Sequence, residues 1–301
     1  MFTTFKEIES YVLSQNMKKR IALANAHEEP ALSAVVNAKR RGVVEGTLIG
    51  KKAEIVQMLH DMGESEADYE IIDFDGEELE SAKIAIKLVK EGKADIPMKG
   101  ILQTSNFARA ILNRETGLVP ASGRRLVSQC GIFEYEGRFV MITDAAININ
   151  PDVDTQIGIV ENALPVAKAL GNDCPKVAVL SAVENVTEKM ASTVTAAEIA
   201  RRGVPGCIIS GPLALDGAIS MESVKHKAIH DPVAGQADIL LVPFIEIGNV
   251  LYKACTYIAG KTMASTICGA SCPVVITSRA DTPDSKYYSI LMAVLRCIKG
   301  C

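Results

Sequence analysis

Short apolar runs alternate with amphipathic segments over the first hundred residues, and this alternation constrains the fold more than any other feature. The expected strands and the helices between them are, in chain order, 20–24, 27–41, 46–49, 51–62, 69–73, 77–91 and 94–98. Strands and helices that alternate in this way form a mostly parallel sheet with helices on both faces. Right-handed crossovers connect such strands by default. The sequence therefore predicts an α/β fold.

The pattern changes after residue 124. Two apolar runs, 131–135 and 139–143, flank Glu136-Gly137, which predicts a hairpin. Pro151-Asp152 is a strong breaker, and we expect a domain boundary near 150. A second alternating series then begins, with helices and strands expected at 153–170, 176–180, 187–202, 207–210, 237–243, 246–257, 273–277 and 287–299.

Composition and targeting signals narrow the classes of function. The chain has 32 Lys and Arg against 36 Asp and Glu, a formal charge of −4, and no Trp. Without a basic stripe and interleaved aromatics, nucleic-acid binding is not expected. The N-terminus lacks a signal-peptide pattern, and no apolar run approaches the roughly 20 residues that span a bilayer. Eight scattered cysteines without a C-x-x-C pair predict reduced thiols, so we expect a cytoplasmic protein.

Several familiar site motifs are missing from the sequence. It has neither the G-x-x-x-x-G-K-[ST] phosphate loop nor a G-x-G-x-x-G after the first strand. A G-x-S-x-G nucleophile elbow is also absent. The absence of these motifs argues against three classes of protein: a nucleoside triphosphatase, an orthodox dinucleotide-binding enzyme and a serine hydrolase.

A polar cluster follows the expected strand near 273–277. Thr277-Ser278-Arg279-Ala280-Asp281 places a hydroxyl, a guanidinium and a carboxylate at a strand's carboxyl end, where ligands of open α/β sheets bind. Ser and backbone N–H groups can cradle an oxyanion, Arg can fork onto phosphate, and Asp can take a proton. The alternative is a polar turn in which Asp281 or Asp284 caps the next helix.

Further polar residues follow other strands. Lys99 comes after the fourth strand, and Thr104 begins a short helix that carries Arg109. Arg138 precedes the strand that ends at Asp144. Together with Arg279 these cations can converge on a phosphate group. The alternative for each of them is a solvated surface cation.

Two sites in the second half also follow strands. Gly211 and Pro212 come after the strand at 207–210, and glycine permits a ligand to approach the backbone closely. Asn249 either hydrogen-bonds a ligand or caps the helix that follows it.

Six segments, taken in order, resemble the family of phosphate acetyl/butyryltransferases and cover about 90–286. They are Met98-Lys99-Gly100, Thr143-Asp144-Ala145-Ala146-Ile147-Asn148, Gly211-Pro212-Leu213-Ala214-Leu215-Asp216, Pro232-Val233-Ala234-Gly235-Gln236-Ala237-Asp238-Ile239-Leu240, Gly248-Asn249-Val250-Leu251-Tyr252-Lys253 and Thr277-Ser278-Arg279-Ala280-Asp281. The first 90 residues resemble the family only in their alternating pattern. The first and last of the six segments look more like the butyryl branch than the acetyl branch.

The resemblance implies a fold and a reaction. The fold is two three-layer α/β/α domains with mostly parallel sheets, of the isocitrate/isopropylmalate-dehydrogenase-like type, with the active site in a cleft between them. The domains are expected at 1–150 plus 266–301 and at 151–265. The implied reaction is acyl-CoA plus phosphate giving acyl phosphate plus CoA, without a metal or other cofactor, in a homodimer or larger homo-oligomer.

The resemblance also implies roles for individual residues. Ser278 and Arg279 match a Ser-Arg pair of the acetyl branch, in which an Asp follows a few residues later. That Asp does not transfer cleanly, so both Asp284 and Asp281 are candidates for the base. Lys99, Thr104, Arg109, Arg138, Gly211, Pro212 and Asn249 are the expected contacts to phosphate and CoA.

Three alternative functions stay open. The chain resembles phosphate acetyltransferases as well, and it also fits a non-catalytic protein that binds CoA or acyl phosphate. A metal-dependent hydroxyacid dehydrogenase of the same fold would need clustered aspartates for Mg²⁺ or Zn²⁺, and the sequence has none at suitable spacing.

Overall fold

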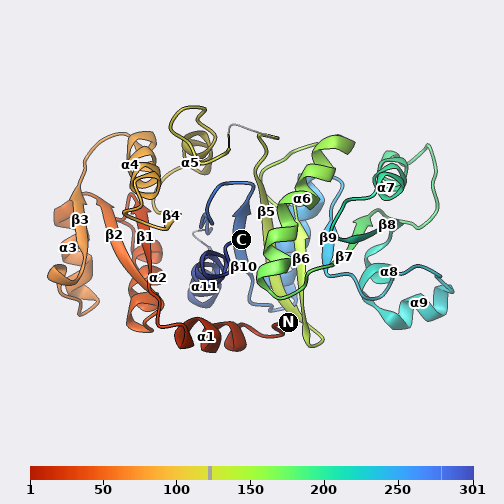
Figure 1. Ribbon diagram of the computed structural model, residues 1–301, viewed down its shortest axis with the longest axis horizontal. Coiled ribbons are helices and arrows are strands. Elements are labelled where there is room, and N and C mark those ends of the chain that lie inside the picture. The colour runs from red at the N-terminus through yellow and green to blue at the C-terminus, as the bar shows by residue number, and fades with distance from the viewer. Residues whose placement is uncertain (121–123, 279) are drawn as a thin grey trace. The chain divides into compact units, whose positions relative to one another are not determined.

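The computed structural model describes residues 1–120, 124–278 and 280–301, and these form two compact bodies (Figure 1). The terminal body consists of Phe5–Arg125 and Ala264–Cys301. The central body consists of Leu126–Met263 together with Met1–Thr4.

The terminal body is built on a parallel sheet. Its strands are β1 (Lys19–Ala24), β2 (Val44–Gly50), β3 (Glu70–Asp73) and β4 (Ile96–Lys99), in the order β3-β2-β1-β4. Val275 pairs in parallel with Met98 of β4, and Val274 pairs with Ile267 of the strand β10 (Ala264–Cys268). Residues from the far end of the chain therefore lie beside β4.

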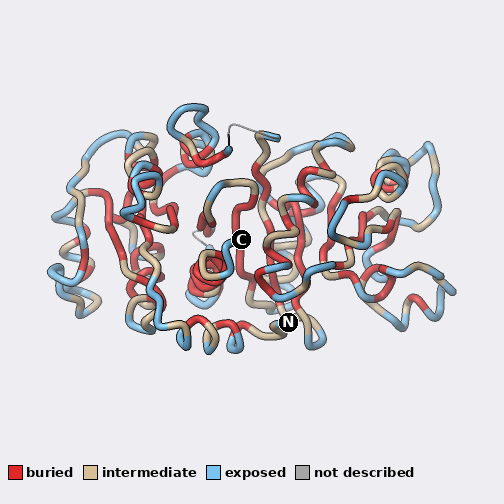
Figure 2. Tube along the Cα trace, viewed as in Figure 1, coloured by how far each residue is buried: buried red, intermediate tan, exposed pale blue. Residues whose placement is uncertain are grey.

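Helices cover this sheet. They are α1 (Phe5–Ser14), α2 (Glu29–Arg40), α3 (Lys52–Asp61), α4 (Glu78–Lys90), α5 (Thr104–Ile111), α11 (Pro283–Lys299) and the short 3₁₀ helix η1 (Glu66–Asp68). The connections between these parallel strands are right-handed crossovers. The connections from β1 to β2 and from β2 to β3 therefore place α2 and α3 on one face of the sheet. The connection from β3 back to β4 runs in the opposite direction and places α4 on the other face. The helix α11 packs against α1, α2 and β10. It is buried along most of its length, and Tyr287 is its largest fully buried side chain (Figure 2).

The central body also has a mostly parallel sheet. Its strands are β5 (Ser128–Tyr135), β6 (Arg138–Thr143), β7 (Lys176–Leu180), β8 (Ile208–Leu213) and β9 (Ile239–Leu241), in the order β5-β6-β9-β7-β8. Among these described strands, only β5 runs antiparallel to its neighbour. The predicted hairpin is present, and Glu136 and Gly137 both have positive φ, at 46° and 74°, as a two-residue turn requires.

The helices of the central body follow the second alternating series. They are α6 (Val153–Ala169), α7 (Ala191–Arg202), α8 (Leu215–Ile219), α9 (Met221–Lys227), α10 (Ile245–Lys253) and the π-helical continuation η2 (Ala254–Ile258). The fold class predicted from the sequence is confirmed.

Three elements near the C-terminus differ from the sequence prediction. The strand expected at 273–277 is reduced to bridges at Val274 and Val275, and β10 was not expected. The helix α11 begins at Pro283 rather than at Tyr287. It begins earlier because the Thr282 hydroxyl accepts the backbone N–H of Ser285 and Pro283 occupies the first turn.

The division of the chain also differs from the expected one. The bodies divide after residues 125 and 263, whereas the sequence placed the divisions near 150 and 265. The hairpin lies in the central body because β6 pairs in parallel with β9, from Met141 opposite Ile239 to Thr143 opposite Leu241.

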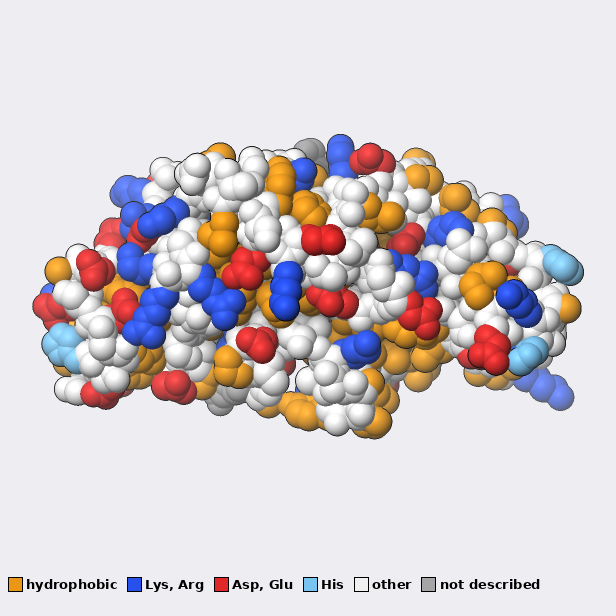
Figure 3. Space-filling model, turned by 90° about the horizontal axis from the view of Figure 1, so that it is seen from below, with side chains coloured by type: hydrophobic (Ala, Val, Ile, Leu, Met, Phe, Trp, Pro, Cys, Tyr) orange, Lys and Arg blue, Asp and Glu red, His pale blue; other side chains and the backbone are white. Residues whose placement is uncertain are grey.

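The surface carries charges of both signs. Figure 3 shows Lys and Arg side chains interspersed with Asp and Glu on the face drawn, in keeping with the formal charge of −4. No helix in the described part of the chain is both long and apolar enough to cross a membrane.

Candidate functional site

The strand order of the terminal body marks a place for a ligand. The chain runs from β1 outward to β3 and then returns to β4 on the other side of β1. Open α/β sheets bind ligands at such a switch point, outside the carboxyl ends of the strands. Lys99 is the last residue of β4, so it lies at this switch point.

The two loops that leave the switch point are bonded to each other. The backbone N–H of Gly100 donates to Ala24 (2.9 Å), and that of Ile101 donates to Asn25 (3.0 Å). A Cβ on Gly100 would come within 2.3 Å of the Asn25 carbonyl oxygen, so only glycine fits here. The Met98-Lys99-Gly100 segment is thus shaped by close contact between backbones.

Lys99 is turned toward the backbone of its own loop. It is 7% exposed, and its Nζ donates to the carbonyl oxygens of Gly100 (3.2 Å) and Leu102 (3.1 Å). The ammonium supports the loop that leads to α5. The structure confirms its place at the strand end, while its contact with phosphate stays a prediction.

The turn after Thr277 is held by Asp281. The Asp281 Oδ2 accepts the backbone N–H of Ser278 (2.7 Å), and the Asp281 N–H donates to the Ser278 carbonyl oxygen (3.1 Å). Ser278 itself is exposed, whereas Thr277 is buried. Arg279, the predicted phosphate ligand, lies outside the described residues.

The first turn of α11 presents Asp284 and Lys286 differently. Asp284 is exposed, and its side chain forms no hydrogen bond or ion pair with any described residue. Lys286 is buried, and its Nζ donates to the carbonyl oxygen of Asp281. Burial lowers the pKa of Lys286, and the charge of Asp281 opposes this shift. Thr282 caps the helix, so neither aspartate has the capping role considered from the sequence.

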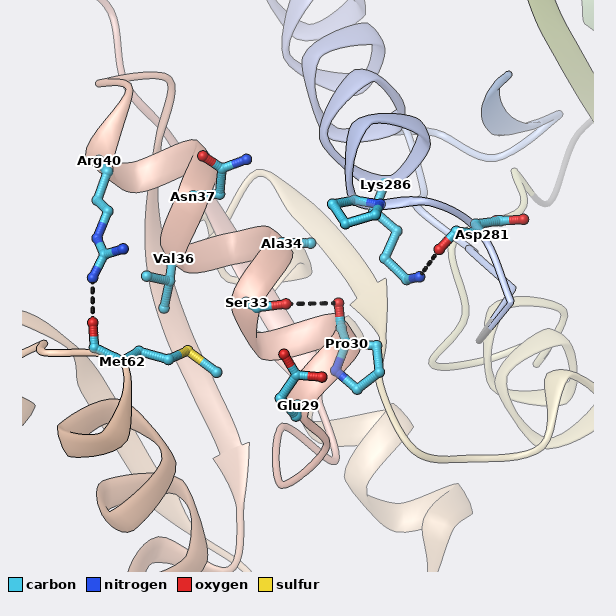
Figure 4. Close-up of a pocket in the computed structure, with 11 residues that line it drawn as sticks. Glu29, Pro30, Ser33, Ala34, Val36, Asn37, Arg40, Met62, Asp281 and Lys286 are labelled. Carbon is cyan, nitrogen blue, oxygen red and sulfur yellow. Dashed lines mark hydrogen bonds between the residues drawn. The ribbon is translucent and has the colours of Figure 1, made fainter. Parts of the chain in front are cut away.

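A cavity of about 510 Å³ lies beside this turn, between α2 and the start of α11 (Figure 4). Its lining mixes charged, polar and apolar side chains: Glu29, Pro30, Ser33, Ala34, Val36, Asn37, Arg40, Met62, Asp281, Pro283 and Lys286. Arg40 is not available to a ligand there, because it pairs with Glu64 (2.7 Å) and donates to the Met62 carbonyl oxygen.

The short helix α5 carries the other predicted phosphate contacts of this body. Thr104 is its first residue, but the Glu78 carboxylate already accepts from the Gln103 N–H (2.8 Å) and from the Asn106 amide (2.9 Å). An acid therefore occupies this helix N-terminus. Arg109 is exposed and forms no ion pair or hydrogen bond within the described ranges, so it is a free cation.

In the central body, Asp144 organises the loop after β6. It is 2% exposed, and its carboxylate accepts backbone N–H groups from Gln129 (3.2 Å), Ala146 (3.0 Å), Ile147 (3.1 Å) and Asn148 (3.1 Å). Burial raises its pKa, and these hydrogen bonds oppose the shift. Sequence reasoning did not give Asp144 this role; a lone Asp directly after an apolar strand is the only signal.

The helix α10 packs closely on that loop. A Cβ on Gly248 would lie 2.3 Å from the Asp144 carbonyl oxygen. Asn249 lies inside the helix and its Nδ2 donates to the Ala145 carbonyl oxygen (3.4 Å), whereas Phe244 occupies the cap position. Asn249 is therefore not the cap that the sequence alternative proposed.

Arg138 lies away from the edge where ligands are expected. It begins β6, five residues before Thr143, which corresponds to roughly 17 Å along a strand. Its guanidinium stands 5.8 Å from the Tyr135 ring across the hairpin. The structure therefore does not bring Arg138 to the carboxyl end of β6.

Gly211 and Pro212 lie within β8 rather than after it. A Cβ on Gly211 would approach the Val179 carbonyl oxygen at 2.9 Å, so the neighbouring strand β7 accounts for this glycine. Their contact with a ligand stays a prediction.

The central body has its own switch point, between β7 and β9. An apolar hollow of about 490 Å³ lies there, lined by Leu180, Ser181, Ala182, Met190, Ser192, Leu215, Pro243, Phe244, Ile247, Val250, Leu251 and Ala254. Among the described residues, no three His, Cys, Asp or Glu side chains group as metal ligands would.

Comparison with known proteins gives consistent matches along the chain. The family described as "Phosphate acetyl/butaryl transferase" matches residues 77–294. A phosphate butyryltransferase of Clostridium acetobutylicum is 42% identical, with 98% of each chain covered. A phosphate acetyltransferase of Thermotoga maritima is 36% identical, with 94% of this chain and 97% of the relative covered.

A solved structure agrees with these sequence matches. The branched-chain phosphotransacylase from Enterococcus faecalis V583 superposes with a TM-score of 0.81 at 34% identity. The superposition covers 93% of this chain and 99% of the other.

Proposed function

Because the chain belongs to the phosphate acetyl/butyryl transferase family, we propose that it transfers a short-chain acyl group reversibly between CoA and inorganic phosphate. The observation that carries the proposal is the match to a phosphate butyryltransferase over nearly the whole chain. The same match favours butyryl as the acyl group. Ser278 follows Val275, whose parallel bridge to Met98 of β4 lies beside the switch point, and this supports the location of the chemistry in the terminal body.

The proposed reaction needs a proton acceptor and stabilisation of negative charge. In one direction the CoA thiol gives up its proton, the sulfur attacks the carbonyl carbon of the acyl phosphate, and phosphate leaves. The Ser278 hydroxyl donates to the oxyanion that develops on that carbonyl. Arg279 and Arg109 neutralise the phosphate oxygens.

We assign the base to Asp284 rather than to Asp281. The Asp281 carboxylate already accepts the N–H of Ser278 and so fixes the turn. The Asp284 carboxylate is exposed on the first turn of α11 and has no partner in the described part of the chain. A free carboxylate is the better candidate to receive a proton from a substrate.

The assay that tests this function measures free thiol. Butyryl-CoA and the enzyme should release CoA only when phosphate is added, and EDTA should not inhibit, since the proposal requires no metal or other cofactor. Arg279→Ala should lower turnover and raise the KM for phosphate without unfolding the protein. If the wild-type protein releases no CoA when phosphate is added, the result would favour a non-catalytic CoA-binding protein. Activity that requires NAD and a divalent metal would indicate a dehydrogenase.

The acyl group needs a separate measurement, because the acetyl relative matches almost as much of the chain. One methylene in an apolar pocket changes binding by only ~1–3 kcal/mol. Comparison of kcat/KM for acetyl-, propionyl-, butyryl- and isobutyryl-CoA decides between the branches, and a preference for acetyl-CoA contradicts the butyryl assignment.

We further propose that the protein acts as a homodimer through the exposed apolar stripe of α10 and η2. The stripe consists of Phe244, Ile247, Val250, Tyr257 and Ile258, whose exposed fractions run from 37% to 87%. It continues from the apolar hollow of the central body, which Phe244, Ile247 and Val250 also line. Contiguous apolar surface of this kind is typical of an interface.

The cytoplasm is the proposed compartment. The eight cysteines are scattered along the sequence without a C-x-x-C pair, which supports a reducing environment.

A further inference from the structure

Lys286 is a buried cation directly behind the turn at Ser278–Asp281, and the reaction outlined above does not use it. Its side chain lies on the first turns of α11 and the residue is only 4% exposed. A buried ammonium loses hydration, and an apolar side chain of similar volume often stabilises a fold equally well or better. Stability alone is therefore a poor reason for a lysine at this position.

The ammonium of Lys286 is linked to Ser278 through one residue. The Lys286 Nζ donates to the carbonyl oxygen of Asp281, the contact drawn in Figure 4. Asp281 in turn accepts the Ser278 N–H on its carboxylate (2.7 Å) and donates its own N–H to the Ser278 carbonyl oxygen (3.1 Å). A shift of Lys286 would therefore shift the backbone that carries the Ser278 hydroxyl.

Lys286 belongs to a helix, α11, that is held in place by hydrogen bonds to β10. The Ser289 hydroxyl on α11 accepts the backbone N–H of Ser265 in β10 (2.9 Å). Further along the helix, Arg296 donates to the Ile267 carbonyl oxygen (2.9 Å). These bonds tie α11 to the strand beside it, so the helix can hold a loop in place through a side chain.

The other side of the turn is less constrained by packing. The cavity of about 510 Å³ opens there, with Asp281 and Lys286 in its wall and α2 opposite. Because the cavity lies between Asp281 and α2, side chains of α2 do not press the turn into position. Hydrogen bonds must supply more of the constraint.

We propose that Lys286 is a positioning residue, which holds Asp281 so that the Ser278 hydroxyl stays directed at the reacting acyl group. This inference rests on the proposed function and adds to it a residue that acts through Ser278. Misplacement of a reacting group by about 1 Å can cost a hundredfold in rate.

The test replaces Lys286 with methionine, which is one atom shorter than lysine, keeps an unbranched apolar side chain and removes the donor. Lys286→Met should lower kcat roughly 10- to 100-fold, leave the KM for butyryl-CoA near the wild-type value, and leave the Tm unchanged or higher. The matched control is Lys90→Met, because the Lys90 Nζ also donates to a backbone carbonyl, that of Glu115 (3.0 Å), but on an exposed surface. The control should keep wild-type kcat.

A second variant asks whether Lys286 acts through Ser278. In a Ser278→Ala background, Lys286→Met should change kcat by no more than about twofold, because residues that act as a unit are not additive. Wild-type turnover in Lys286→Met, equal losses in both backgrounds, or a loss of Tm or of folded protein would each overturn the inference. If the wild-type enzyme itself releases no CoA with phosphate, the proposed function fails instead.

Discussion

Asp281 and Asp284 lie three residues apart, and their carboxylates differ in their hydrogen bonds. Asp281 closes a turn by accepting the Ser278 N–H (2.7 Å), whereas Asp284 is exposed at the start of α11. We therefore expect Asp284→Asn to lower kcat by roughly 10²- to 10⁴-fold, the usual contribution of a positioned general base. The fold should be unaffected, because the side chain has no bond to lose among the described residues.

Asp281→Asn is the matched comparison for that prediction. An amide oxygen can still accept the Ser278 N–H, so we expect a smaller loss of kcat than in Asp284→Asn. Steady-state rates of both variants, with far-UV circular dichroism as a check on folding, distinguish the two roles. Full activity in Asp284→Asn would assign the base elsewhere.

At the scale of elements, the position of α11 depends on its N-cap. The Thr282 Oγ1 accepts the Ser285 N–H (3.1 Å) and Pro283 fixes the first turn. Thr282→Ala should lower the free energy of unfolding by about 1 kcal/mol. Thr282→Ser retains the hydroxyl and should behave like the wild type, with urea denaturation as the measurement. Equal stability of Thr282→Ala and wild type would contradict the role of the cap.

The elements that the sequence predicted best are those with a clear period. The four parallel strands of the terminal body and the hairpin at Glu136-Gly137 follow from apolar runs and turn chemistry. The strand β10 was missed because Ala264–Cys268 is short, and β-branched residues occupy only two of its five positions. The helix α11 was placed too late because Thr282-Pro283 resembles a loop until the cap is recognised.

The positions of the site residues could be predicted from the sequence only where the end of a strand could be predicted. Lys99 lies where the sequence placed it, because the last residue of a parallel strand reaches the ligand-binding edge. Ser278 follows an isolated parallel bridge at Val275 rather than the strand that the sequence predicted. Arg138 lies at the start of its strand, as the sequence indicated, and for that reason it does not reach this edge. Partners that come from distant parts of the chain, such as the carbonyls around the Lys99 ammonium, leave no local signal in the sequence.

At the scale of the whole molecule, the apolar stripe on α10 and η2 predicts self-association. Val250 is 67% exposed, so a glutamate there would be tolerated in a monomer and costly in an interface. We expect Val250→Glu to shift the protein from dimer to monomer in sedimentation velocity. Val194→Glu, at a 42% exposed site on α7, is the control and should leave the dimer intact. A wild-type protein that sediments as a monomer contradicts the interface.

The terminal body is assembled from both ends of the chain, and this has a consequence during synthesis. The central body comes almost entirely from one continuous stretch, Leu126–Met263, whereas the terminal body needs Ala264–Cys301 to follow Phe5–Arg125. Domains generally fold as units while the ribosome adds residues in order. The body begun first on the ribosome is therefore finished last, and its sheet waits with β4 unpaired on one side until Val275 has emerged. A nascent chain halted before that point would expose this strand edge to chaperones.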